Sequence, residues 1–188
     1  LYRNYLTDAG MDSVMNYCFR DWVKGFAEGG NPSSFDSSFN NFRSQIPVSP
    51  WYTLMNLISS HDSPRMLNLL SGDKAKLKLA VLLQMTLPGA PSIYYGDEVA
   101  LPGGGDPDNR RTYPWADKGG SPDMDMYNHF RKLIGIRNAH PALRGGQIST
   151  ALVSDAQKLY SYVRWNLSET LVVVLNNGES NQTASISV

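Results

Sequence analysis

The stretch of sequence that decides the fold is Thr53-Leu54-Met55-Asn56-Leu57-Ile58-Ser59-Ser60-His61-Asp62. Its first seven residues form a largely apolar run of strand length, and the polar cluster Ser60-His61-Asp62 follows directly. Such a run is typical of a strand that is buried on both faces of a parallel sheet. We therefore predict a buried strand over residues 53–59, with its polar end open to the edge of the sheet.

Helices are predicted on both sides of this strand. Residues 34–46 place three phenylalanines at spacings of four and three, which indicates one buried helical face. Residues 73–86 place an apolar residue at every fourth position after Asp73, and Asp73 is suited to cap this helix. Residues 125–138 show the same helical spacing, with His129 expected on the polar side. The apolar residues concerned are Phe35, Phe39, Phe42, Leu77, Val81, Met85, Tyr127, Phe130, Leu133 and Ile134.

Two further short strands are predicted in the same part of the chain, over residues 13–17 and 92–95. Strand and helix then alternate along the chain, and this order implies parallel strands that are joined by crossover helices. The fold class predicted for this part is therefore α/β.

The pattern of the sequence changes near residue 145. We divide the chain there into an α/β part, residues 1–144, and an all-β part, residues 145–188. Another alternating segment is expected to begin at Ser180. An antiparallel sheet is predicted from three segments in which apolar and polar residues alternate, 147–153, 158–165 and 170–175.

Composition excludes several classes of function. The 17 Lys+Arg residues balance the 17 Asp+Glu residues, so there is no electrostatic case for nucleic acid or an anionic membrane as the main partner. The longest purely apolar runs are five residues, against the ~18 that a membrane span needs. The single cysteine, Cys18, excludes an intrachain disulfide. Because the sequence starts at Leu1 without an initiator Met, we expect a piece of a longer protein, and its low charge leans towards an exported one.

Polar residues follow each of the three strands predicted in the α/β part, and they are Asn16-Tyr17, Ser60-His61-Asp62 and Gly96-Asp97-Glu98. The carboxyl ends of parallel strands meet at one edge of the sheet, where ligands bind. His61 beside Asp62 fits the binding of a hydroxyl-rich or charged substrate, although the same pair also occurs as a hydrogen bond within a loop. Both interpretations stay open at this point.

A fourth polar element, residues 103–111, lies in a long loop after the last of these strands, and loops of this length are usually functional. Asp106, Asp108 and Asn109 offer oxygen ligands to a hard cation, but no Glu follows at the EF-hand distance and Pro107 suits a rigid turn. We assign no metal site to them. Aromatic residues that could stack on sugars, or simply pack, are Trp51, Tyr94, Tyr95 and Trp115.

Four linked motifs make the chain resemble the α-amylase family of glycoside hydrolases. Residues 55–65 (MNLISSHDSPR) resemble the strand-seven signature of that family, and residues 89–98 (GAPSIYYGDE) its strand-eight signature. Residues 12–21 (DSVMNYCFRD) are similar to its strand six. The loop 104–111 (GGDPDNRR), with Trp115, resembles the branch of neopullulanase, cyclomaltodextrinase and maltogenic amylase.

The resemblance implies a (β/α)8 TIM barrel followed by an antiparallel β-sandwich C-terminal domain. Residues 1–144 would supply the last three βα units of the barrel, and residues 145–188 the truncated start of the β-sandwich. A barrel of this kind takes ~250 residues, so residues 1–144 cannot close one by themselves.

The resemblance also implies an activity, the retaining hydrolysis of α-glucosidic bonds in maltodextrins, cyclodextrins or pullulan. The family carries its nucleophile on strand four and its general acid on strand five, both upstream of Leu1. Asp62 is then implied as a transition-state stabiliser, and His61, Asp106 and Arg110 as substrate-binding residues. The implied partner is an α-glucan oligosaccharide. No cofactor is implied, while calcium in the complete protein and a homo-oligomer stay open.

Two alternatives to the hydrolase remain. The chain could be a carbohydrate-binding fragment without catalysis, or part of an α-glucan transferase or isomerase that shares the same motifs. Because the nucleophile and the acid lie upstream, the isolated chain is expected to be inactive.

Overall fold

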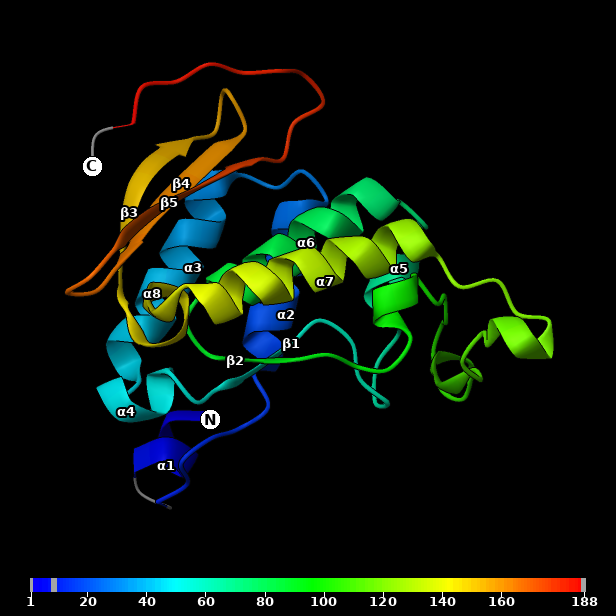
Figure 1. Cartoon of the computed structure of the whole chain (residues 1–188). Coiled ribbons are helices and arrows are strands. Elements are labelled where there is room, and N and C mark those ends of the chain that lie inside the picture. The colour runs from blue at the N-terminus through cyan, green and yellow to red at the C-terminus, as the bar shows by residue number, and fades with distance from the viewer. Residues whose placement is uncertain (1, 8–9, 187–188) are drawn as a thin grey trace.

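Three parallel backbone segments form the centre of the α/β part (Figure 1). In this computed structural model, which describes residues 2–7 and 10–186, β1 (Met55–Leu57) pairs in parallel with β2 (Ala90–Ser92). On the other side of β1, Met15 forms a single parallel bridge with Met55. The predicted parallel arrangement is therefore confirmed.

The strands themselves are shorter than predicted. The ladder of β1 covers residues 55–57 of the predicted 53–59, and β2 lies two residues before the predicted start at 92. Its central residue, Pro91, has no N–H to donate to the ladder. The strand predicted over 13–17 is reduced to the parallel bridge at Met15, because Asn16 already caps the next helix by accepting a hydrogen bond from the backbone N–H of Phe19 at 3.1 Å.

Helices cover these strands, and the three predicted helices are confirmed. Asp73 caps α6 through the backbone N–H groups of Ala75 and Lys76, at 2.9 and 3.1 Å. In α3, Phe35 and Phe39 are buried and Phe42 is partly buried, as their spacing indicated. The helices are α1 (Tyr2–Thr7), α2 (Tyr17–Ala27), α3 (Pro32–Gln45), α4 (Val48–Trp51), α5 (Met66–Leu69), α6 (Lys74–Thr86), α7 (Met124–Ala139) and α8 (Pro141–Gly145).

Three antiparallel strands in the order β3-β4-β5 follow α8, as predicted: β3 (Gln147–Ser154), β4 (Leu159–Trp165) and β5 (Thr170–Asn176). The further alternating segment expected from Ser180 is not a strand over residues 180–186, and residues 187 and 188 lie outside the described residues. Alternation of apolar and polar residues does not by itself supply a neighbouring strand to pair with. The segment is held instead by side-chain hydrogen bonds, from Asn176 to the carbonyl of Ser180 and from Gln157 to the carbonyl of Thr183.

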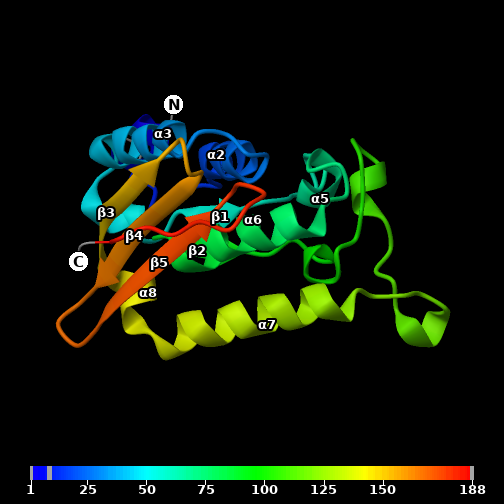
Figure 2. The ribbon, with the colours of Figure 1, turned by 90° about the horizontal axis from the view of Figure 1, so that it is seen from above.

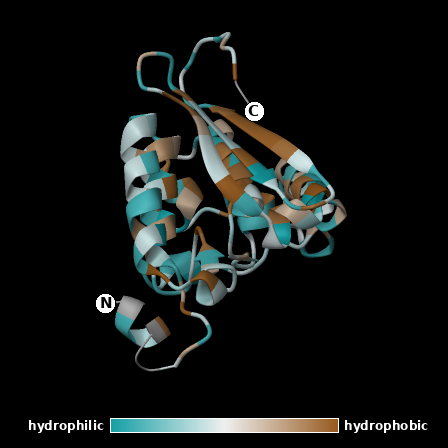
Figure 3. Ribbon diagram, turned by 90° about the vertical axis from the view of Figure 1, so that its left-hand side faces the viewer, coloured by the Kyte–Doolittle hydropathy of each residue, from teal (hydrophilic) through white to brown (hydrophobic). Residues whose placement is uncertain are grey.

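A single apolar core joins this sheet to the helices. Figure 2 shows the sheet lying beside α2, α3 and α6, and Figure 3 shows hydrophobic (brown) stretches on both the strands and the helices. Tyr160 of β4 meets the rings of Phe26 and Phe35 with centroids 6.0 and 5.3 Å apart. The Tyr160 hydroxyl also donates to Asp36 at 3.0 Å. The sheet is therefore packed on α2 and α3, and the boundary near residue 145 remains a prediction.

Candidate functional site

The residues singled out from the sequence lie on loops at the carboxyl ends of the parallel strands. His61 and Asp62 follow β1, and His61 Nε2 lies 3.2 Å from Asp62 Oδ1. Both side chains remain about 60% exposed, at 60% and 58%. A pair that is exposed to this degree can exchange its water contacts for the hydroxyl groups of a ligand.

The second pair comes from the long loop, which contains the short 3-10 helices η2 (Asp108–Arg110) and η3 (Ala116–Lys118) (Figure 1). Arg110 Nη2 lies 3.1 Å from Asp106 Oδ1, and both side chains are about half exposed. Arg110 Nε also donates to the backbone carbonyl of His61 at 3.3 Å. The structure thus brings all four predicted site residues together. We call His61, Asp62, Asp106 and Arg110 the rim.

Asp62 is oriented by a group of hydroxyls beneath it. The Tyr17 hydroxyl donates to Asp62 Oδ2 at 3.4 Å and lies 3.1 Å from Ser60 Oγ. Ser60 Oγ in turn accepts from the backbone N–H of Asp62 at 3.1 Å. Tyr17 is the first residue of α2, so the end of the first parallel segment reaches the same edge, as the position of Asn16-Tyr17 in the sequence suggested.

Below the rim lies a buried polar layer, in which Asp97 and Asn109 were singled out from the sequence as polar residues, but Arg65 and the burial of all three were not expected. Arg65 is fully buried and forms an ion pair with Asp97 at 3.1 Å. Asn109 is also fully buried and donates through Nδ2 to the carbonyls of His61 and Ser63, at 2.7 and 3.1 Å. Arg65, Asp97 and Asn109 all occur inside the quoted motifs, but nothing in their spacing shows that they contact one another.

Burial has the largest effect on the pKa of Asp97 in this layer. It raises the pKa of Asp97 to about 7, although the hydrogen bond from Ser59 and the charge of Arg65 both act to lower it. The carboxyl therefore titrates near neutral pH, with the positive charge of Arg65 beside it.

The three oxygen-bearing side chains considered for a cation point to different partners. Asp106 pairs with Arg110, whereas Asp108 accepts from Arg111 Nε at 2.6 Å and from the backbone N–H of Gly104 at 2.6 Å. Asn109 is directed into the buried layer. In the described part of the chain, no group of three or more His, Cys, Asp or Glu residues could hold a metal ion.

The aromatic candidates separate into two kinds. Trp51 is buried in the core, where its ring meets those of Phe39 and Phe42, so it is not available to a ligand. Trp115 on the long loop is 59% exposed and Tyr95 is 42% exposed. Trp115 and Tyr95 therefore remain candidates for stacking on a sugar.

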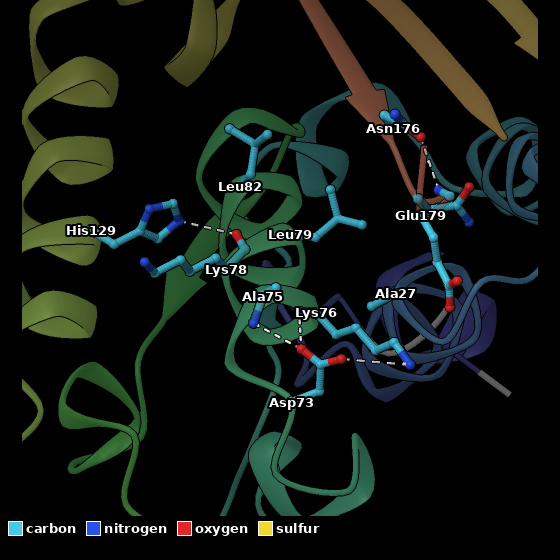
Figure 4. A pocket seen from close by; sticks show the side chains of 12 residues that line it. Ala27, Asp73, Ala75, Lys76, Lys78, Leu79, Leu82, His129, Asn176 and Glu179 are labelled. Atoms are coloured by element: carbon cyan, nitrogen blue, oxygen red, sulfur yellow. Dashed lines mark hydrogen bonds and ion pairs between the residues drawn. The ribbon is translucent and has the colours of Figure 1, made fainter. Parts of the chain in front are cut away.

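A cavity of about 460 Å³ lies away from the rim, between α6, α7 and the residues after β5 (Figure 4). Several of its ionic groups already have partners, because Lys78 pairs with Asp125 at 2.5 Å and Asp73 caps α6 and lies 3.7 Å from Lys76. His129 was expected on the polar side of α7. It is half-buried against α6 instead, 3.1 Å from the carbonyl of Lys78, and burial lowers its pKa. We therefore place the candidate site at the rim.

Among the helices that the structure describes, none combines the length and the apolar character needed to cross a bilayer.

Comparisons with known proteins agree with the motifs. The family model for the α-amylase catalytic domain matches residues 1–146. The chain is 37% identical to Neopullulanase 2 of Thermoactinomyces vulgaris over 179 residues, which cover 94% of this chain and 30% of that protein. It is 36% identical to a cyclomaltodextrinase of a Bacillus species, covering 92% of this chain and 31% of that protein. The chain thus spans about a third of the length of these relatives.

Solved structures show the same similarity in three dimensions. A debranching enzyme of Nostoc punctiforme superimposes with a TM-score of 0.91 at 35% identity, over 99% of this chain and 41% of that one. A cyclic α-maltosyl-(1→6)-maltose hydrolase of Arthrobacter globiformis superimposes with a TM-score of 0.83 at 31% identity, over 94% and 40%.

Proposed function

Because the chain belongs to the α-amylase family of glycoside hydrolases, we propose that the protein that carries it cleaves α-glucosidic bonds in maltodextrins, cyclodextrins or pullulan. The observation that supports this proposal most is the rim. Two exposed polar pairs, His61–Asp62 and Asp106–Arg110, lie on one edge and are linked by the hydrogen bond from Arg110 to the carbonyl of His61. An edge of this kind presents directional donors and acceptors to several sugar hydroxyls at once.

In this proposal, Asp62 stabilises the transition state. Retaining glycosidases pass through a state with oxocarbenium character, and hydrogen bonds to the sugar 2-hydroxyl strengthen as that charge develops. A contact that strengthens in the transition state raises the rate more than it raises substrate affinity. The hydrogen bond from Tyr17 and the backbone contact to Ser60 support a fixed orientation of the Asp62 carboxylate.

His61, Asp106 and Arg110 bind the substrate. His61 lies beside the sugar that is cleaved, and the Asp106–Arg110 pair holds the next glucose unit away from the cut. The exposure of all four side chains supports this arrangement, because a glucan can reach them without displacing the core.

The nucleophile and the general acid come from another part of the complete protein. The motifs of this chain match strands six, seven and eight of the family barrel, whereas the two carboxylates of the retaining reaction lie on strands four and five. They would act ~5–5.5 Å apart, on the sugar that Asp62 and His61 hold. The isolated chain is accordingly expected to be inactive.

We further propose that Met15, β1 and β2 are three adjacent strands of a (β/α)8 barrel, and that β3 to β5 begin a β-sandwich. Their parallel pairing and their covering helices support the first assignment. The free edge beside β2 supports it too, because Ile93, Tyr95 and Tyr127 remain exposed there around a groove of about 380 Å³. On the outward face of β5, Val172 and Val174 are exposed, as a sheet that packs on a second sheet requires.

The complete protein with Asp62→Asn tests the function. We expect kcat on maltoheptaose to fall by roughly 100-fold or more, with a smaller change in substrate affinity, because the lost interaction belongs mainly to the transition state. Asp117→Asn is the matched control, since Asp117 is an exposed aspartate of the long loop, outside the rim, with its Oδ2 3.9 Å from the only ion partner described for it, Lys118.

An Asp62→Asn enzyme with unimpaired turnover would contradict the proposed role. A wild-type protein that binds maltoheptaose without turning it over would instead favour the carbohydrate-binding alternative. Products longer than the substrate would favour a transferase.

A further inference from the structure

Arg65 occupies an unusual position for a cation, because its side chain is completely buried directly beneath the rim. Its guanidinium lies against the rings of Tyr94 and Tyr95, with Cζ 4.4 and 4.9 Å from the ring centroids. Burying a charge is costly unless it is paired and hydrogen-bonded, and stacking on aromatic rings offsets part of that cost. A residue with this cost needs a structural reason.

The hydrogen bonds of Arg65 join three separate segments of the chain. Nη1 donates to the carbonyl of Tyr95 at 2.7 Å and to Asp97 Oδ1 at 3.1 Å, both in the loop after β2. Nε donates to the carbonyl of Asn109 at 3.0 Å, in the long loop. The backbone N–H of Arg65 donates to the carbonyl of Gly103 at 3.0 Å. Arg65 itself lies three residues after Asp62, so the third segment is the one that carries the His61–Asp62 pair.

Asn109 links the long loop to the segment of residues 60–65 a second time. Its backbone carbonyl accepts from Arg65, while its side chain donates to the carbonyls of His61 and Ser63. The position of residues 103–111 relative to residues 60–65 is therefore determined twice, by a buried guanidinium and by a buried amide. Arg110, the next residue after Asn109, carries one half of the second rim pair.

We propose that Arg65 is a positioning residue that sets the separation between the His61–Asp62 pair and the Asp106–Arg110 pair, and thereby the fit of a glucan chain that contacts both. This inference rests on the proposed function for its substrate. Arg65 touches no substrate in this account. It acts through the backbone of Asn109 and through the loop after β2.

The planar fork of arginine is essential to this role. Its nitrogens point in fixed directions, so one side chain can reach Tyr95, Asp97 and Asn109 while its face lies on two rings. The ammonium of lysine is a compact point charge on a flexible stem and cannot satisfy all of these contacts at once. Arg65→Lys therefore keeps the positive charge but removes the fixed directions of the hydrogen-bond donors.

The chain offers a matched control in Arg164. This residue is also fully buried, and its three side-chain nitrogens donate to the backbone carbonyls of Thr86, Gly146 and Gln147. It lies on β4, in the sheet rather than at the rim. Arg164→Lys consequently reproduces the loss of a buried arginine fork without affecting the loops that carry the rim.

The experiment compares Arg65→Lys and Arg164→Lys in the complete protein, well below the unfolding temperature of either variant. Two substrates are used: maltotetraose, which reaches both rim pairs, and p-nitrophenyl α-glucoside, whose single glucose reaches only the Asp62 side. For Arg65→Lys we expect kcat/KM on maltotetraose to fall by roughly tenfold or more, mainly through KM, with a much smaller loss on the short substrate. For Arg164→Lys we expect equal, small changes on both.

Amide hydrogen exchange gives a second readout that does not depend on activity. Arg65→Lys should speed the exchange of residues 103–111, and Arg164→Lys should leave that segment unchanged. If Arg65→Lys does not fold, Asn109→Ala removes the other half of the connection without leaving a charge unpaired. The same substrate-length effect and the same faster exchange are expected from it.

Equal losses on both substrates for Arg65→Lys, or wild-type kinetics and wild-type exchange, would overturn the proposal and leave Arg65 as a stabilising residue only. A wild-type protein without activity on either substrate would overturn the proposed function instead. In that case, the exchange of residues 103–111 would still decide whether Arg65 holds the loop.

Discussion

Replacing Asp97 by Asn should change how the stability of the protein depends on pH. Burial raises the pKa of the Asp97 carboxyl from 3.8 to about 7 in the folded protein, even though Arg65 lies 3.1 Å away. Between about pH 4 and pH 7, the folded state therefore holds a proton that the unfolded state has released. The free energy of unfolding falls as the pH rises through this window, and the contribution is constant above it.

The size of the effect follows from the difference between the two pKa values. A rise from 3.8 to about 7 corresponds to about 4 kcal/mol at most, because each pH unit is worth about 1.4 kcal/mol. Asparagine has nearly the same shape and does not titrate, so Asp97→Asn removes this contribution. Relative to the variant, the wild type should lose up to about 4 kcal/mol between pH 4 and pH 7.5.

Urea unfolding of the complete wild-type and Asp97→Asn proteins, at steps of pH between 4 and 8, measures this difference. Taking the difference at each pH cancels the titration of all other groups, and Asp117→Asn serves as the exposed control. A difference that does not vary with pH would refute the reasoning. Such a flat difference would mean that Arg65 holds Asp97 ionised in the folded protein throughout this range.

Two further changes have clear outcomes. Gly103→Ala should detach the long loop, because the new Cβ would lie 2.7 Å from the carbonyl oxygen of Asp108 and 2.8 Å from the Cα of Asn109. We expect faster amide hydrogen exchange at residues 103–111 in this variant. Unchanged exchange would contradict the prediction. Phe35→Ala should destabilise the contact between α3 and the sheet by about 3–5 kcal/mol, since Phe35 is buried against Phe26 and Tyr160. Urea unfolding checks that value, and a loss below about 1 kcal/mol would show that the ring cluster does not join the two parts.

The features of this fold that depend on a residue pattern within one helix or strand could be predicted from the sequence. The phenylalanine spacing in α3 and the Asp73 cap of α6 depend on residues within one element, so no knowledge of a partner was needed. The same holds for the alternation in β3, β4 and β5. The ends of the parallel strands could not be predicted, because a strand extends only where a neighbour offers hydrogen bonds, and Pro91 offers no N–H in β2.

The candidate site was also predictable only in part, because some of its residues are marked by a local pattern and others depend on contacts between distant residues. His61 and Asp62 directly follow an apolar strand, which is a local signal, whereas Asp106 and Arg110 were implied by the resemblance of the loop motif. The buried layer beneath them depends on contacts between residues 32 and 44 positions apart, Arg65 with Asp97 and with Asn109. Arginine in a sequence is typical of an exposed surface, so only the folded arrangement reveals that Arg65 is buried.

The most direct test of this account is a crystal structure of the complete Asp62→Asn protein with maltotetraose bound. We expect one glucan chain that lies along the rim, with sugar hydroxyls within hydrogen-bond distance of residue 62, His61 and the Asp106–Arg110 pair together. A glucan that contacts residue 62 but not Arg110, or one that is found only in the cavity between α6 and α7, would contradict it.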